Sequence, residues 1–103
     1  MTTGDNEKYD NVDVATTLSA LIAPLSLTQL EKLTIEAIHE HRGLLAKAEA
    51  AFESLENAED AKADTAGELR ETYTKAMLAV RAQQSVLATL VERLGFIPRV
   101  PPS

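Results

Sequence analysis

The sequence predicts an all-α protein, a long antiparallel two-helix hairpin (a helical coiled coil) that dimerises into a four-helix bundle. The chain has 103 residues, a length that fits one small domain. Apolar residues recur at helical spacing through two stretches of about 30 residues each. Aromatic residues make up only 4% of the chain and tryptophan is absent, so we expect an aliphatic core whose alanine and leucine favour helices.

The segment before the first long helix divides into two parts. Residues 1–14 are polar and acidic, and we expect them to form a flexible tail. Residues 15–103 are expected to form a single helical hairpin domain. A short apolar stretch from Val14 to Leu25 opens it. The stretch predicts one or two helical turns, which Pro24 stops.

The first long helix is predicted at about residues 26–56. Ser26 and Gln29 have the spacing of a capping box, and a start at Thr28 with Glu31 as its partner is the alternative. At about 100° per residue, the larger apolar side chains share one stripe of this helix with a single histidine. The stripe consists of Leu30, Leu33, Ala37, His41, Leu44, Leu45, Ala48, Phe52 and Leu55.

The second long helix is predicted at about residues 64–94, after a turn among the small and charged residues 57–67. Asp64 or Thr65 is expected to cap its start. Gly95, followed by Pro98, ends it as a left-handed residue and leaves a C-terminal tail at 95–103. The helix carries a heptad seam, which is typical of a helix packed along its length: Leu69, Tyr73, Ala76, Val80, Gln83, Leu87, Leu90 and Leu94.

Both stripes are wider than a two-helix seam needs, which predicts a second copy of the chain. Pairing two hairpins into a C₂ homodimer covers the flanks of each stripe. Gln83 and Gln84 lie mid-seam and have two interpretations. They can set the register through hydrogen bonds across the bundle, or one of them can be exposed at the edge of the stripe. The expected core and dimer residues are Leu30, Ala37, His41, Leu44, Leu45, Tyr73, Met77, Val80, Gln84, Leu87, Val91 and Leu94.

Composition excludes several classes of function. Because the chain has no cysteine, thiol chemistry and thiolate metal sites are impossible. No apolar run is long enough to span a bilayer, so we expect a cytoplasmic protein that does not bind membranes. The net charge of -6 opposes direct nucleic-acid binding.

No residue pattern predicts a catalytic, cofactor or metal site, so we do not expect an enzyme. His39 and His41 are two residues apart and point to different faces of a helix, which does not suit two ligands of one metal. Glu36 and His39 match the Glu-x-x-His pattern of di-iron bundles, but His39 lies opposite the apolar stripe. A di-metal carboxylate bundle is therefore the least favoured hypothesis.

Three segments carry a resemblance to a known family: residues 33–42, residues 52–55 and, above all, Leu94-Gly95-Phe96-Ile97-Pro98-Arg99-Val100. They resemble the TraM family, anti-activators of quorum-sensing control of conjugal plasmid transfer. The resemblance implies a cytoplasmic homodimer of antiparallel helices. It also implies that the chain binds TraR, a LuxR-type transcriptional activator, and blocks its binding to promoter DNA. The alternative is a structural or adaptor helical-bundle homodimer that binds another helical protein.

Partner binding needs exposed apolar anchors, and the sequence offers seven candidate residues in all. Five of them have a second interpretation: Phe96 and Ile97 can fold back over the end of the bundle, Leu55 can belong to the core, and Ile35 and Leu78 can be scattered surface residues. The candidates are Leu55, Phe96, Ile97, Pro98, Arg99, Ile35 and Leu78.

Overall fold

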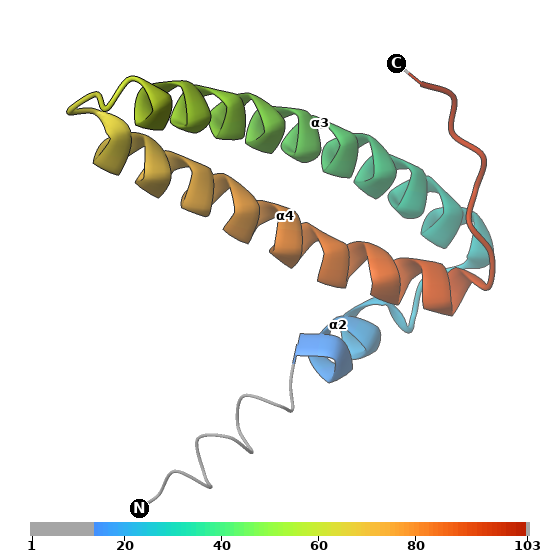
Figure 1. The fold of residues 1–103 in the computed structure, drawn as a ribbon. Coiled ribbons are helices and arrows are strands. Elements are labelled where there is room, and N and C mark those ends of the chain that lie inside the picture. The colour runs from blue at the N-terminus through green and yellow to red at the C-terminus, as the bar shows by residue number, and fades with distance from the viewer. Residues whose placement is uncertain (1–13, 103) are drawn as a thin grey trace, which may run out of the picture. The chain divides into compact units, whose positions relative to one another are not determined.

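The computed structural model describes residues 14–102, and in that part of the chain it contains three helices (Figure 1). Helix α2 spans Val14–Ile22, α3 spans Leu27–Asp60 and α4 spans Ala66–Leu94. The all-α class and the antiparallel hairpin of two long helices are confirmed. The expected flexible tail lies, apart from Val14, outside the described residues.

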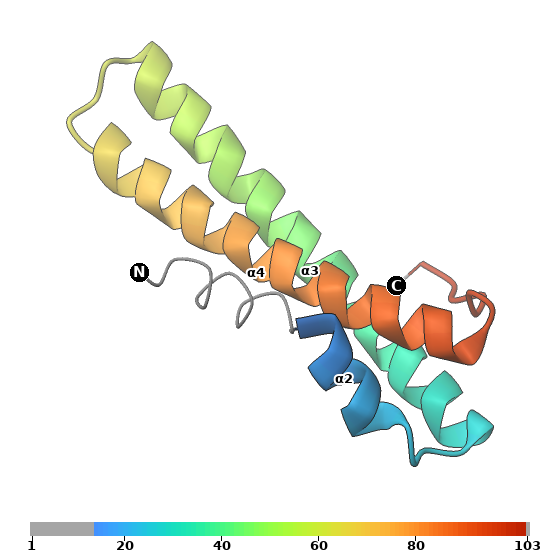
Figure 2. The ribbon, with the colours of Figure 1, turned by 90° about the horizontal axis from the view of Figure 1, so that it is seen from below.

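Contacts divide the chain into two compact units. The turn unit, residues 39–84, holds the end of α3 and the start of α4, which lie side by side (Figures 1 and 2). The terminal unit holds α2, the start of α3, the end of α4 and the C-terminal tail.

Helix α3 begins with the capping box that the sequence predicts. The hydroxyl oxygen of Ser26 accepts a hydrogen bond from the backbone N–H of Gln29 at 3.1 Å. The side-chain oxygen of Gln29 accepts one from the N–H of Ser26 at 2.9 Å. Both bonds satisfy backbone donors that a helix start leaves unpaired. The start at Ser26 is therefore confirmed over the alternative at Thr28.

The connection between the long helices closes α3 with a Schellman motif. The N–H of Ala63 donates to the carbonyl of Ala58 at 2.8 Å, and the N–H of Lys62 donates to that of Glu59 at 3.0 Å. Lys62 has a φ of 54°, the left-handed conformation that this motif requires. Helix α3 therefore ends at Asp60, four residues beyond the predicted end at 56.

Helix α4 starts and ends at residues that the sequence singles out. The carbonyl of Thr65 accepts the first helical hydrogen bond, from Leu69 at 3.0 Å, so Thr65 rather than Asp64 is the N-cap. At the other end, Gly95 has a φ of 94°, and its N–H donates to the carbonyl of Val91 at 2.8 Å. The predicted left-handed stop at Gly95 is confirmed.

The terminal unit has an aliphatic core. Leu30 and Ala37 of α3 pack with Leu90 and Leu94 of α4. Ile22, Leu25, Val86 and Leu87 pack against this cluster from its edge. Its one buried polar side chain among the described residues is Thr34, which is fully buried. Thr34 Oγ1 donates to the carbonyl of Leu30 at 2.7 Å, which satisfies the hydroxyl within its own helix.

The turn unit buries small and aliphatic side chains between its two helices. Ala48, Leu55 and Ala58 of α3 are buried, as is Val80 of α4, which is fully enclosed. The α3 residues are spaced by seven and three positions, which places them on one face of the helix. A surface ion pair between Arg70 and Glu59 links the two helices near the connection, and exposed pairs of this kind contribute little stability.

Candidate partner-binding surfaces

The C-terminal tail presents apolar side chains to solvent. Ile97 is 74% exposed and Phe96 is 47% exposed, whereas Pro98 and Val100 are buried. From residue 97 onward the side chains therefore alternate outward and inward, as they do in an extended segment. The two buried residues hold the tail against the terminal unit, and Ile97 and Arg99 face outward beside Phe96. Figure 1 shows the tail leaving the end of α4.

Two predicted anchors, Pro98 and Leu55, are buried by the chain itself, which corrects their assignment to an exposed surface, and a third, Ile35, is partly covered. Pro98 is buried because its side chain falls on the inner side of the alternating tail. Leu55 is only 4% exposed, because it shares the inward face of α3 with Ala48 and Ala58. Ile35 is half-buried beside the fully buried Thr34. Leu55 thus takes the core position that the sequence left open as its second interpretation.

Of the remaining candidates, Leu78 is exposed at 65% on α4. It lines a shallow hollow of the turn unit with polar neighbours such as Arg70 and Glu71. A single exposed leucine among polar side chains is normal for a protein surface. Leu78 therefore remains a possible contact but has no apolar neighbour in that hollow.

One face of the turn unit, here called the aromatic face, gathers larger apolar side chains. It surrounds a hollow of about 250 Å³. The rings of Phe52 on α3 and Tyr73 on α4 lie 5.4 Å apart and are tilted by 50°, a favourable arrangement for two aromatic rings. Phe52 is 44% exposed and Leu45 is 37% exposed. The hollow is lined by Leu45, Ala48, Glu49, Phe52, Tyr73 and Met77.

The residues predicted for the core or the dimer interface fall into three groups. The first group, Leu30, Ala37, Val80 and Leu94, is buried within one chain. The second group is half-buried: His41, Leu44, Tyr73, Met77, Leu87 and Val91. The third group, Leu45 and Gln84, is exposed.

Two polar positions, Gln84 and His41, belong to these groups. Gln84 is exposed rather than part of the core, in agreement with the alternative that one of the two glutamines lies at the edge of the stripe, and its amide oxygen accepts a hydrogen bond from Arg81 at 3.0 Å. His41 is half-buried, and its Nδ1 atom is buried and makes no hydrogen bond among the described residues. From its place in the stripe, the ring is predicted to lie over the edge of the core with a hydrogen bond to the other helix or to water.

Within residues 14–102, no group of three or more histidine or acidic side chains is placed to hold a metal ion. Between residues 14 and 102, no helix combines the length and the apolar character needed to cross a membrane. What the surface offers is apolar contact area on the tail and on the aromatic face. Apolar area exposed on a helical hairpin is typical of helical proteins that bind other proteins.

Comparisons with known proteins identify the family. Its sequence profile, described as prokaryotic transcriptional repressor TraM, matches residues 1–99. The transcriptional repressor TraM of Agrobacterium fabrum is 37% identical over 81 residues, which cover 79% of this chain and 79% of that protein. The TraM protein of Rhizobium radiobacter is 39% identical over 83 residues, 81% of each chain. The chain belongs to the TraM family of transcriptional repressors, which are regulators rather than enzymes. No solved structure is significantly similar to it.

Proposed function

We propose that this chain is an anti-activator, which binds the LuxR-type activator TraR and blocks its binding to DNA. Genes for conjugal plasmid transfer would then stay silent until the activator exceeds the supply of this protein. The observation that carries the proposal is the family match across residues 1–99. The activator and its promoters are in the cytoplasm, so the protein would act there.

Charge supports the approach of the two proteins. A domain that binds DNA phosphates must present basic side chains, whereas this chain has a net charge of -6. Opposite charges steer the two proteins together and raise the association rate at low salt. Steering raises the association rate, whereas the affinity of the complex comes mainly from apolar anchors. Exposed Phe96 and Ile97, held in place by buried Pro98, suit that role.

The proposed mechanism is a change in the activator rather than competition for its DNA-binding surface. A dimeric activator reads two half-sites, so its two DNA-binding domains must keep a fixed spacing. Binding that holds them at another spacing lowers DNA affinity without covering the residues that contact DNA. This mechanism predicts a transient complex of DNA, activator and this protein, and faster release of the activator from DNA.

The rate of release from DNA tests the mechanism. Activator with its acyl-homoserine lactone is loaded on immobilised promoter DNA, and its dissociation is followed as this protein is added. We expect the dissociation rate to rise with the concentration of this protein. Activator that binds this protein in solution, yet leaves DNA at an unchanged rate, would show simple competition instead.

We propose further that the protein is a homodimer, whose two copies pack through the aromatic face. Leu45 and Phe52 expose apolar area beside half-buried Tyr73 and Met77, which a second copy related by a two-fold axis would cover. Aromatic residues and methionine are enriched at protein interfaces. The arrangement would build a four-helix bundle from two hairpins.

A charge placed on the aromatic face tests the dimer. Phe52→Glu should convert the protein to a monomer in sedimentation or light-scattering measurements, because the carboxylate would be buried without a partner. Leu78→Glu is the control, since it adds the same charge at an exposed site outside that face. If Phe52→Glu remains a dimer, the dimer interface does not lie on the aromatic face.

A structural or adaptor bundle that binds another helical protein is the second candidate, favoured by exposed apolar surfaces alone. Binding to purified TraR separates the two functions. The adaptor function predicts no complex with TraR under conditions in which TraR binds its promoter.

A further inference from the structure

The turn unit carries a second hollow, here called the charged groove, that the proposed dimer does not use. Its volume is about 720 Å³, and both helices of the turn unit line it. No residue of the groove lines the hollow of the aromatic face. The lining residues are Leu44, Lys47, Ala51, Glu68, Glu71, Thr72, Lys75, Ala76 and Ala79.

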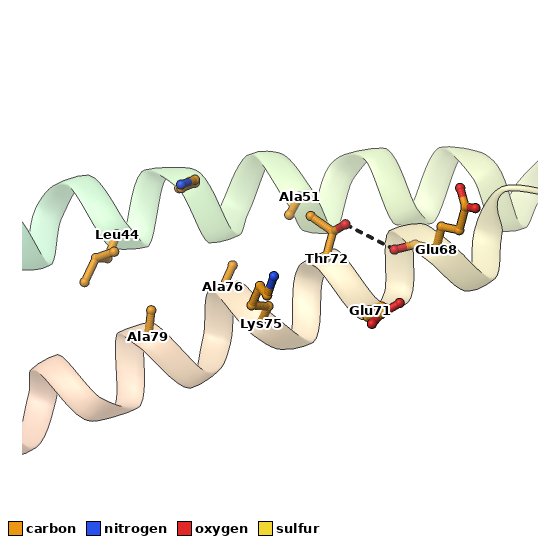
Figure 3. A pocket seen from close by; sticks show the side chains of 9 residues that line it. Leu44, Ala51, Glu68, Glu71, Thr72, Lys75, Ala76 and Ala79 are labelled. Carbon is orange, nitrogen blue, oxygen red and sulfur yellow. Dashed lines mark hydrogen bonds between the residues drawn. The ribbon is translucent and has the colours of Figure 1, made fainter.

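The chemistry of the groove changes along its length (Figure 3). Leu44 and Ala79 lie at one end, and Glu68 and Glu71 lie at the other. Lys75 projects into the space between them. One end is therefore apolar, the middle is basic and the far end is acidic.

The floor of the groove is made of small side chains. Ala51 of α3 and Ala76 and Ala79 of α4 are all half-buried and line it. Because an alanine projects only a methyl group, the backbone of an incoming helix can approach closely. Glu68 and Ala79 are eleven positions apart on α4, a rise of about 16 Å, so the groove matches about three turns of helix.

The charged side chains of the groove are free to bind a partner. Lys47, Lys75 and Glu71 are exposed, and none of them forms an ion pair within the described part of the chain. Glu71 and Lys75 have the spacing of a helical ion pair, yet they make no such contact. A partner helix that places a basic side chain opposite Glu71 and an acidic one opposite Lys75 would pair with both.

We propose that the charged groove receives a helical segment of the activator, about three turns long. The inference rests on the proposed function and names the part of the partner that this protein recognises. The segment presents an apolar side chain, an acidic one and a basic one on successive turns. The apolar side chain packs on Leu44 and Ala79, the acidic one pairs with Lys47 and Lys75, and the basic one pairs with Glu68 and Glu71.

The chemistry of the groove favours such a partner over a second copy of this chain. The core of a homodimer interface is depleted in charged residues, which fits the aromatic face, where Glu49 is the one charged lining residue, better than the groove, which has four. Charge pairs across an interface set its register and exclude wrong partners. The ordered charges would thus select one helix in one direction.

Charge reversal at the two lysines tests the proposal with a matched control. Lys47→Glu with Lys75→Glu should raise the dissociation constant for the activator about 100-fold, about 10-fold for each lysine. The control combines Lys32→Glu with Arg81→Glu, which makes the same change in net charge at exposed positions outside the groove. Because both variants alter long-range steering equally, a difference between them in the dissociation rate reports contact in the groove.

A bulky substitution tests whether a helix packs on the alanine floor of the charged groove, and it changes no charge. Ala76→Phe should weaken binding of the activator about as strongly as the double lysine variant does, because the ring would occupy the path of the incoming helix. Ala46→Phe, at an exposed position of α3 outside the groove, should bind normally. Helix content and melting temperature confirm that each variant is folded.

The outcomes separate this inference from the proposed function. If the unaltered protein fails to bind the activator, the proposed function fails first. If it binds and the groove variants match their controls, the groove is not the contact and the inference is overturned. Groove variants that lose self-association while they keep the activator would show that a second copy occupies the groove, which also overturns it.

Discussion

Truncation of Leu55 distinguishes a core residue from a partner contact. In the structure Leu55 is 4% exposed, whereas Leu78 in the same unit is 65% exposed. Leu55→Ala and Leu78→Ala delete the same atoms from a buried and an exposed site. The pair therefore isolates the effect of burial on the free energy of unfolding.

The magnitudes follow from the exposed fractions. Leucine to alanine at a buried site costs about 2–5 kcal/mol, since lost transfer energy and a residual cavity both contribute. Full burial of a leucine side chain contributes ~1.5–3 kcal/mol to stability. Because Leu78 is only about one-third covered, its truncation should lower the free energy of unfolding by less than about 1 kcal/mol. For a domain of this size, about 3 kcal/mol lowers the melting temperature by more than about 10 °C.

Thermal and urea unfolding followed by circular dichroism measures both variants at equal protein concentration, because association shifts apparent stability. We expect Leu55→Ala to unfold much earlier than the parent protein and Leu78→Ala to unfold near it. Equal stability of the two variants, with activator binding lost only in Leu55→Ala, would refute the buried placement of Leu55 and restore it as an exposed anchor.

Three further substitutions test local features of the backbone and core by the same unfolding measurements. Lys62→Gly should stabilise the protein by about 0.5 kcal/mol, because glycine removes the left-handed penalty but loses more entropy on folding; a loss of stability would contradict the Schellman motif. Gly95→Ala should destabilise it by about 1–2 kcal/mol through its φ of 94° alone, since no atom lies within 4 Å of the added methyl group; an unchanged midpoint would argue against the left-handed stop. Thr34→Val should be neutral or stabilising by up to about 1 kcal/mol, because it removes a buried hydroxyl and leaves no partner unsatisfied; marked destabilisation would assign the hydroxyl another role.

The helices were predictable because local signals mark most of their ends. Ser26 and Gln29 cap the start of α3, and Gly95 stops α4. The end of α3 at Asp60 was not predictable in the same way. The left-handed residue that closes it is Lys62 rather than glycine, and the alanine-rich sequence around it continues a helix readily.

The candidate surfaces were harder to predict, because periodicity does not show which flank of a stripe its own chain covers. Leu55 lies in the stripe of α3 and is buried, whereas Phe52 in the same stripe is half exposed. Pro98 belongs to a tail whose inward and outward sides only the fold decides. The charged groove was not predictable, because lysines on a helix are ordinarily solvated, and only the packing of α3 on α4 places Lys47 and Lys75 in one hollow.

A gel-shift titration is the most direct test of the anti-activator function. Promoter DNA is mixed with the cognate LuxR-type activator and its lactone, and this protein is added in increasing amounts. We expect the shifted band to disappear as the protein approaches the activator in concentration, and the protein alone to shift no DNA. A band that persists at a large excess, with activator shown to be active, would contradict the anti-activator function.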